Sequence, residues 1–187
     1  IIMLDLEKFL HKYYKKDDKI ILACSTGPDS MFLLYQLLKT NFKKNIIVCY
    51  FNHHIRTQSK DEEKFIKSLS KKFDFQVEIW SENIKKLQSI SSSISIEELA
   101  RIKRYEFLFG ILKKYSSNYI LTAHHLDDKI ETFFFNLTRW SKLTWLINMT
   151  EKSWNILRPL LSLEKTQIID YLQKNNLEYF VDKTNED

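Results

Sequence analysis

The fold of this chain is decided by Ile20-Ile21-Leu22-Ala23-Cys24-Ser25-Thr26-Gly27-Pro28-Asp29-Ser30 and by the apolar run 31–38 that follows it. The first five residues are typical of a buried strand, and the later run is typical of a helix packed against a sheet. At such a strand-to-helix turn, the unpaired amides of the first helical turn and the positive end of the helix dipole favour a phosphate. We therefore expect chemistry at residues 25–30, where the chain keeps one of its two glycines.

Composition indicates an ordinary globular domain. Of the 187 residues, 44% are hydrophobic and 28% are charged, and no apolar run approaches the ~20 residues of a membrane helix. Residues 1–5 lack the pattern of a secretory signal, so we expect a soluble, cytoplasmic protein with no membrane partner. Cys24 and Cys49 fall in predicted buried strands, which favours core residues over a disulfide or a zinc site.

The charge balance is basic. The formal net charge is +5 and the pI is about 9.0. This suits a polyanionic partner, because phosphate neutralisation contributes much of nucleic-acid affinity. A lysine-rich surface that is merely solvated accounts for the charge equally well.

Strand-like and helix-like runs alternate along the chain, which predicts an α/β fold: one domain with a parallel sheet and helices on both faces. Two helix starts carry a capping box, Ser59 with Glu62 and Ser95 with Glu98. The core is expected over about residues 18–145, and residues 146–187 form a helical extension with a helix beginning near Ser162. Strands are expected at 20–24, 46–51, 77–80 and 119–122, and helices at 28–38, 61–73, 96–115 and through Asp128 to about 138.

In an open α/β sheet the ligand lies beyond the carboxyl ends of the strands, so the loops 25–30, 52–56 and 124–128 should meet. The first loop is not a Walker A loop, because no Gly-Lys-Ser/Thr follows it. It offers backbone amides and the hydroxyls of Ser25 and Ser30, while Asp29 could orient the loop or hold a metal. An ordinary capped helix start is the alternative interpretation.

Two further clusters carry candidate chemistry. On a helix, His124, Asp128 and Glu131 would share one face at spacings i, i+4 and i+7, which suits magnesium ligation or acid/base work. Arg101 and Arg104 lie one helical turn apart and could grip a phosphate. For each cluster a solvated helix surface is the alternative.

The loop 25–30 resembles the Ser-Gly-Gly-x-Asp-Ser motif of the PP-loop ATPases, which cleave ATP between its α and β phosphates. The resemblance implies a Rossmann-like, adenine nucleotide alpha-hydrolase-like fold. Taken in order, the remaining motifs resemble those of the tRNA(Ile)-lysidine synthetases over about residues 18–187. These motifs are Phe51-Asn52-His53-His54-Ile55-Arg56, Glu97-Glu98-Leu99-Ala100-Arg101 with Arg104-Tyr105, His124-His125-Leu126-Asp127-Asp128 with Glu131-Thr132, Arg139-Trp140-Ser141, Arg158-Pro159-Leu160-Leu161 and Asp182-Lys183-Thr184-Asn185.

The resemblance implies an ATP-dependent carbon-nitrogen ligase. ATP would adenylate the wobble cytidine of a tRNA(Ile) with a CAU anticodon, and free L-lysine would displace AMP. The implied ATP-binding residues are Ser25, Thr26, Gly27, Pro28, Asp29, Ser30, Asn52 and His53. The implied Mg²⁺ ligands are Asp29, Asp128 and Glu131, and the implied catalytic residues are Asp128, Glu131, His124, Arg101 and Arg104.

The chain departs from that pattern at two places. Thr26 stands where the family has glycine, and a β-branched residue is expected to resist positive φ and to weaken ATP binding. The family's C-terminal tRNA-binding domains are absent after Asp187, so we expect a fragment or a shortened enzyme. The alternatives are a cytidine thiolase, although no Cys-x-x-Cys pair occurs, and a non-catalytic tRNA-binding remnant. The sequence leaves a homodimer open.

Overall fold

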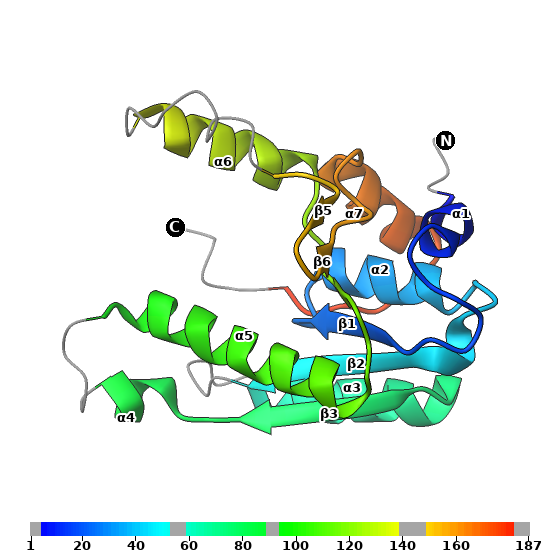
Figure 1. Cartoon of the computed structure of the whole chain (residues 1–187), viewed down its shortest axis with the longest axis horizontal. Coiled ribbons are helices and arrows are strands. Elements are labelled where there is room, and N and C mark those ends of the chain that lie inside the picture. Colours follow the sequence, from blue (N-terminus) through cyan, green and yellow to red (C-terminus); the bar gives the residue numbers. More distant parts are fainter. Residues whose placement is uncertain (1–4, 53–58, 89–93, 139–148, 182–187) are drawn as a thin grey trace.

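The computed structural model describes residues 5–52, 59–88, 94–138 and 149–181, which form a six-stranded sheet in the order β3-β2-β1-β4-β6-β5 (Figure 1). All neighbouring strands are parallel except β5 and β6, which are antiparallel. The expected parallel α/β architecture is therefore confirmed. The strands are β1 Ile20–Cys24, β2 Ile46–Asn52, β3 Gln76–Ser81, β4 Ile120–Leu121, β5 Lys152–Ser153 and β6 Ile156–Leu157.

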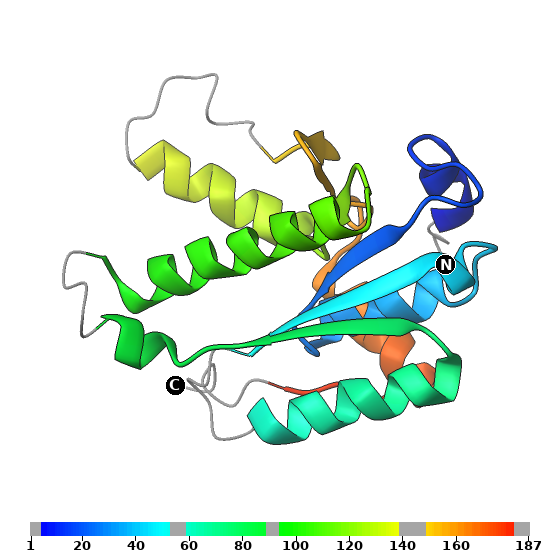
Figure 2. The same ribbon diagram turned by 60° about the horizontal axis from the view of Figure 1, so that its bottom comes forward.

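Helices cover both faces of this sheet (Figure 2). Alternate residues of a strand point to opposite faces. Ile20 and Leu22 accordingly pack in a buried cluster with α1, α2, α3 and α7, whereas Ile21 packs in a second cluster with α4 and α5. The helices are α1 Leu6–His11, α2 Pro28–Leu37, α3 Ser59–Phe73, α4 Ile84–Gln88, α5 Ile96–Lys114, α6 Leu126–Thr138 and α7 Lys165–Lys174, with a 3₁₀ turn η1 at Lys43–Asn45. None of the described helices is long and apolar enough to cross a membrane.

The helix starts differ partly from the predicted capping boxes. Ser95 caps α5 as expected, because its side chain accepts a hydrogen bond from the amide of Glu98 (3.1 Å). Ser59 is itself helical, and the buried Glu62 carboxylate instead accepts a hydrogen bond from the Tyr50 hydroxyl (2.7 Å). Glu62 thus ties α3 to the sheet.

The segment after residue 146, expected to be helical, also adds two strands to the sheet. β6 pairs with β4, and β5 returns antiparallel beside β6. Each strand has only two residues, too few for an alternating apolar pattern to stand out in the sequence. The predicted helix of this segment begins at Lys165 rather than near Ser162.

Candidate active site

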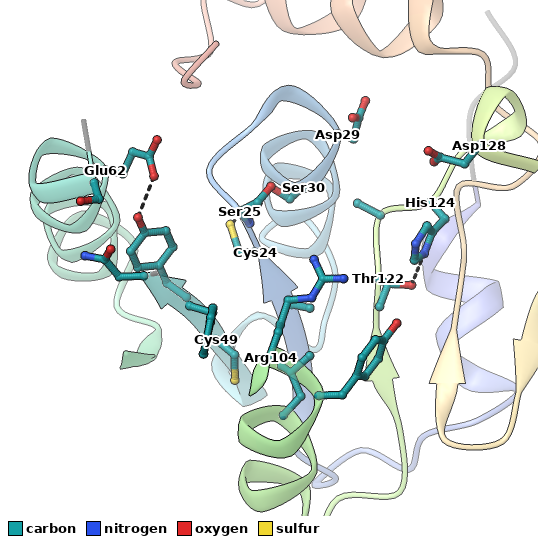
Figure 3. Close-up of a pocket in the computed structure, with 18 residues that line it drawn as sticks. Cys24, Ser25, Asp29, Ser30, Cys49, Glu62, Arg104, Thr122, His124 and Asp128 are labelled. Atoms are coloured by element: carbon teal, nitrogen blue, oxygen red, sulfur yellow. Dashed lines mark hydrogen bonds between the residues drawn. The ribbon is translucent and has the colours of Figure 1, made fainter. Parts of the chain in front are cut away.

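The ends of β1, β2 and β4 and one side of α5 enclose a cavity of about 320 Å³. Its size falls within the usual range for small-molecule sites, about 300–1,000 Å³. Figure 3 shows Ser25 and Ser30 on one side of it, Thr122 and His124 on the other, and Arg104 entering from α5. Residues of the first and third loops thus meet at the carboxyl edge of the sheet as predicted, together with Asn52 of the second, whose residues 53–56 lie outside the described ranges.

In the loop 25–30, Thr26 has a positive φ of 64°. Gly27 has φ of −70° and ψ of 168°, which any residue adopts. Thr26 therefore takes the positive φ that its β-branched side chain disfavours, and weakened ATP binding stays a prediction. Thr26 is fully buried, its hydroxyl donates to the Ser25 carbonyl (2.6 Å), and its own carbonyl accepts from the Phe180 amide (2.9 Å). These bonds offset the strain, which is typically about 1–3 kcal/mol for such a conformation.

The loop leaves the start of α2 open to an anion. Gly27 is the N-cap residue and has no side chain to satisfy the amides of the first turn, and Pro28 opens the helix. The Ser30 hydroxyl lies inside the loop, 3.1 Å from the Gly27 carbonyl, 3.2 Å from the Ser25 amide and 3.3 Å from the Ser25 hydroxyl. A phosphate in this position would supply the missing cap.

The buried His125 lies between the carboxylates of Asp29 and Asp128. His125 Nε2 lies 3.6 Å from Asp29 Oδ2 and 3.5 Å from Asp128 Oδ2, and its Nδ1 lies 3.3 Å from Asp127 Oδ2. Asp128 Oδ2 also accepts the His125 amide (2.8 Å), and Asp127 accepts the Lys165 amide at the start of α7 (2.8 Å). Burial raises the pKa of Asp29, whose Oδ1 is buried without a hydrogen-bond partner.

His124 reaches the cavity by a route that the sequence pattern did not predict. It lies before α6, which begins at Leu126, so His124 does not share a helical face with Asp128. It follows β4 directly, and its Nδ1 is 2.8 Å from the Thr122 hydroxyl (Figure 3). Burial, with smaller contributions from the charges of Arg158 and Arg104, lowers the pKa of His124 to about 4. The imidazole is therefore neutral at neutral pH.

One of the two predicted arginines lines the cavity, and the other does not. Arg104 lines the cavity together with Tyr105 and Leu108 of the same helix. Arg101 is exposed and is not among the residues that line the cavity. It sits three residues nearer the helix start, about 4.5 Å further along the axis.

The three predicted magnesium ligands also differ in whether they line the cavity. Asp29 and Asp128 line the cavity, whereas Glu131 is exposed and lies outside its lining. Within the described ranges, no three His, Cys, Asp or Glu side chains are grouped to hold a metal ion. Asp29 and Asp128 still fit a magnesium that arrives with a nucleotide, since such an ion uses one or two carboxylates plus phosphate oxygens.

The second loop was expected to contribute Asn52 and His53 to the ATP-binding site. Asn52 ends β2, is buried and lines the cavity. His53 lies outside the described residues, as do the motif segments 139–141 and 182–185.

Several residues in or beside the cavity could not be identified from the sequence. His125 lies outside the cavity lining, and only its position between the carboxylates of Asp29 and Asp128 indicates a role. Tyr105, Thr122 and the pair formed by Tyr50 and Glu62 also contribute. The continuous apolar run of β2 predicts that Tyr50 is buried, but it does not predict that its hydroxyl meets a carboxylate.

Both cysteines are buried core residues, as predicted. Cys24 pairs in register with Tyr50, and Cys49 pairs with Ala23, so the two thiols point to opposite faces. Burial raises the pKa of both thiols, which keeps them protonated. They form no disulfide and offer no reactive pair.

Curated relatives share this sequence over most of its length. The chain is 36% identical to the tRNA(Ile)-lysidine synthase of Thermosipho africanus, with 97% of this chain and 44% of that protein covered. It is 35% identical to the enzyme of the same name from Mycoplasma mycoides, with 92% of this chain and 43% of that protein covered. The chain thus spans less than half the length of these relatives.

Solved structures share the fold at low identity. The U34-tRNA thiolase NcsA of Methanococcus maripaludis superposes with a TM-score of 0.73 at 16% identity, covering 89% of this chain and 60% of that one. The NH3-dependent NAD synthetase of Campylobacter jejuni gives 0.63 at 14% identity, covering 94% and 71%. A family model described as the PP-loop domain matches residues 2–187, and the chain therefore belongs to the PP-loop family.

Proposed function

We propose that this chain is the ATP-binding catalytic part of a tRNA(Ile)-lysidine synthetase. It would use ATP to activate the wobble cytidine of a CAU-anticodon tRNA(Ile), join lysine to its 2-carbon, and release AMP and pyrophosphate. Similarity to curated synthetases over 97% of the chain supports the reaction class. The observation that carries the proposal is the meeting of the open helix start, Asp128 and Arg104 in one cavity.

The nucleotide would bind at the Ser25–Ser30 loop. Its phosphates would take the amides at the start of α2 and the hydroxyls of Ser25 and Ser30, and Mg²⁺ would be shared by Asp29 and Asp128. Bound ATP supplies the adenylyl group. Arg104 is placed to stabilise negative charge that develops on a phosphate.

The lysine amine must lose a proton before it attacks. Its pKa of about 10.4 leaves only about one molecule in a few thousand neutral at pH 7. Asp128, at the cavity wall, is the proposed partner of this amine, and the exposed Glu131 one turn further along α6 is the proposed outer contact. The neutral His124 would accept or donate a hydrogen bond to the activated base.

The two alternatives lose support. The thiolase similarity is at 16% identity and concerns the fold alone, and the two cysteines point to opposite faces of the sheet. The non-catalytic remnant was motivated only in part by Thr26, and that part is weakened because Thr26 takes the positive φ with its hydroxyl hydrogen-bonded within the loop.

The proposal is tested by incubating the chain with ATP, Mg²⁺, labelled lysine and CAU-anticodon tRNA(Ile). Lysine-dependent AMP release with label in the tRNA is expected, and the same tRNA with uridine at the wobble position should remain unlabelled. Binding of the tRNA without AMP release, or a requirement for a sulfur donor, would reject it.

A further inference from the structure

Arg158 is a half-buried cation with no counter-charge from the described part of the chain. Its Nη1 donates to the Thr150 carbonyl (3.1 Å), and its Nε is buried without a hydrogen-bond partner. No ion pair formed among the described residues includes Arg158. A half-buried guanidinium to which the described residues offer one neutral hydrogen-bond acceptor, a backbone carbonyl, is costly to desolvate, which suits a group that binds an anionic ligand.

Arg158 lines a second cavity, of about 390 Å³, together with Lys129, Thr150 and Ser162. Lys129 is exposed in the first turn of α6. Glu151 is the one acidic residue in the described lining, and its carboxylate is already engaged: the Tyr13 hydroxyl donates to it (3.0 Å), and Lys12 Nζ lies 3.7 Å away. The cavity therefore has a net positive wall.

This second cavity adjoins the first at the carboxyl edge of the sheet. Arg158 follows β6 directly, and the Thr122 amide donates to the Leu157 carbonyl (2.9 Å), so Arg158 lies beside a residue of the first cavity. Lys129 follows Asp128 in the chain. A ligand spanning both cavities would meet acidic groups in one and cationic groups in the other.

We propose that Arg158 and Lys129 form an oxyanion site, separate from the phosphate loop, for a substrate that reacts with bound ATP. A planar guanidinium binds a carboxylate or a phosphodiester equally well, with Lys129 as a second point charge. Under the proposed function the oxyanion has two sources, the carboxylate of lysine or a phosphodiester of the tRNA. Oxyanion binding as such does not depend on that function.

A phosphate titration of the ¹⁵N-labelled chain, followed by NMR, tests the site directly. A saturating non-hydrolysable ATP analogue and Mg²⁺ occupy the first cavity, and the Arg158 Nε–H signal is assigned by its loss in Arg158→Lys. The signal should shift and saturate with inorganic phosphate, and Lys129→Ala should weaken the binding several-fold while Lys113→Ala, an exposed lysine of α5, should not. A signal that stays still throughout the titration overturns the proposal.

The source of the oxyanion is distinguished by steady-state kinetics of Arg158→Gln. If it is the carboxylate, KM for lysine should rise at least about tenfold and the preference for lysine over 1,5-diaminopentane should vanish. If it is the phosphodiester, KM for tRNA should rise and the slope of log affinity against log salt should fall by about one. Unchanged KM for both substrates, in an assay where the unmodified chain is active, contradicts the inference alone. A chain that never incorporates lysine contradicts the proposed function, and the phosphate titration still decides the site.

Discussion

Thr26 shows how one residue can satisfy a turn that its chemistry disfavours. The positive φ of 64° falls on Thr26, and the hydroxyl that forms the 2.6 Å bond to the Ser25 carbonyl belongs to the same side chain. Local hydrogen bonding is the general means by which small polar residues tolerate such conformations. The phosphate loop therefore keeps its shape without a second glycine.

Two substitutions at Thr26 distinguish the contribution of the hydroxyl to stability from that of the backbone conformation. Thr26→Val keeps the β-branch but loses the bond, so it should lower the free energy of unfolding by about 1–2 kcal/mol. Thr26→Gly relieves the positive φ and should change that free energy by less than about 1 kcal/mol. Urea denaturation checks both values. An unchanged stability of Thr26→Val would show that the hydroxyl is unimportant, and equal losses in the two variants would show that the positive φ carries no cost.

His125 should position Asp29 and Asp128, the two carboxylates proposed to hold magnesium. Because its Nε2 lies 3.6 Å from Asp29 and 3.5 Å from Asp128, His125→Ala should raise KM for ATP-Mg²⁺ by about tenfold, with a smaller effect on kcat. His125→Gln, which keeps a donor, should recover part of the loss. The exposed His11 gives a matched control, His11→Gln, and a KM unchanged by His125→Ala would remove the proposed role.

His124 should make stability depend on pH. Its pKa in the folded chain is lowered by burial to about 4, against about 6.5 in the unfolded chain. Between these values the unfolded chain binds more protons, so stability is fully present above about pH 6.5 and falls as the pH drops to about 4, by about 3 kcal/mol. Chemical denaturation across this range, compared with His124→Asn, measures the contribution. The same pH dependence in both proteins would contradict it.

At the scale of elements, α3 is fastened to the sheet by one buried pair. The Tyr50 hydroxyl donates to Glu62 (2.7 Å), and both side chains are almost fully buried. Tyr50→Phe leaves the carboxylate without its donor and should lower the free energy of unfolding by about 1–3 kcal/mol. Tyr50→Phe combined with Glu62→Leu should recover part of this loss in urea denaturation, and a strictly additive double variant would contradict the pairing.

Elements with strong local signals were predictable, and those without were not. The apolar runs of β1 and β2 and the Ser95 cap of α5 stand out in the sequence. The hairpin of β5 and β6 has two residues in each strand and depends on contact with β4. The helical-face argument failed at His124 because it places every residue on the helix, whereas α6 begins only at Leu126.

At the scale of the whole molecule, the topology brings the site together. β1, β2 and β4 end at one edge, so residues nearly 100 positions apart in the chain, such as Ser25 and His124, line one cavity. The sequence order of the motifs predicted this convergence. It could not predict which residue of each helix reaches the cavity, because Arg101 and Glu131 differ from Arg104 and Asp128 by a single turn.

The central claim is that this cavity binds ATP for cleavage between its α and β phosphates. The most direct measurement is product analysis with ATP labelled at the α-phosphate, in the presence of lysine and CAU-anticodon tRNA(Ile), for the unmodified chain and Asp128→Asn. We expect labelled AMP that requires both substrates and falls by at least about a hundredfold in the variant. Labelled ADP, or AMP formed equally well by Asp128→Asn, would contradict it.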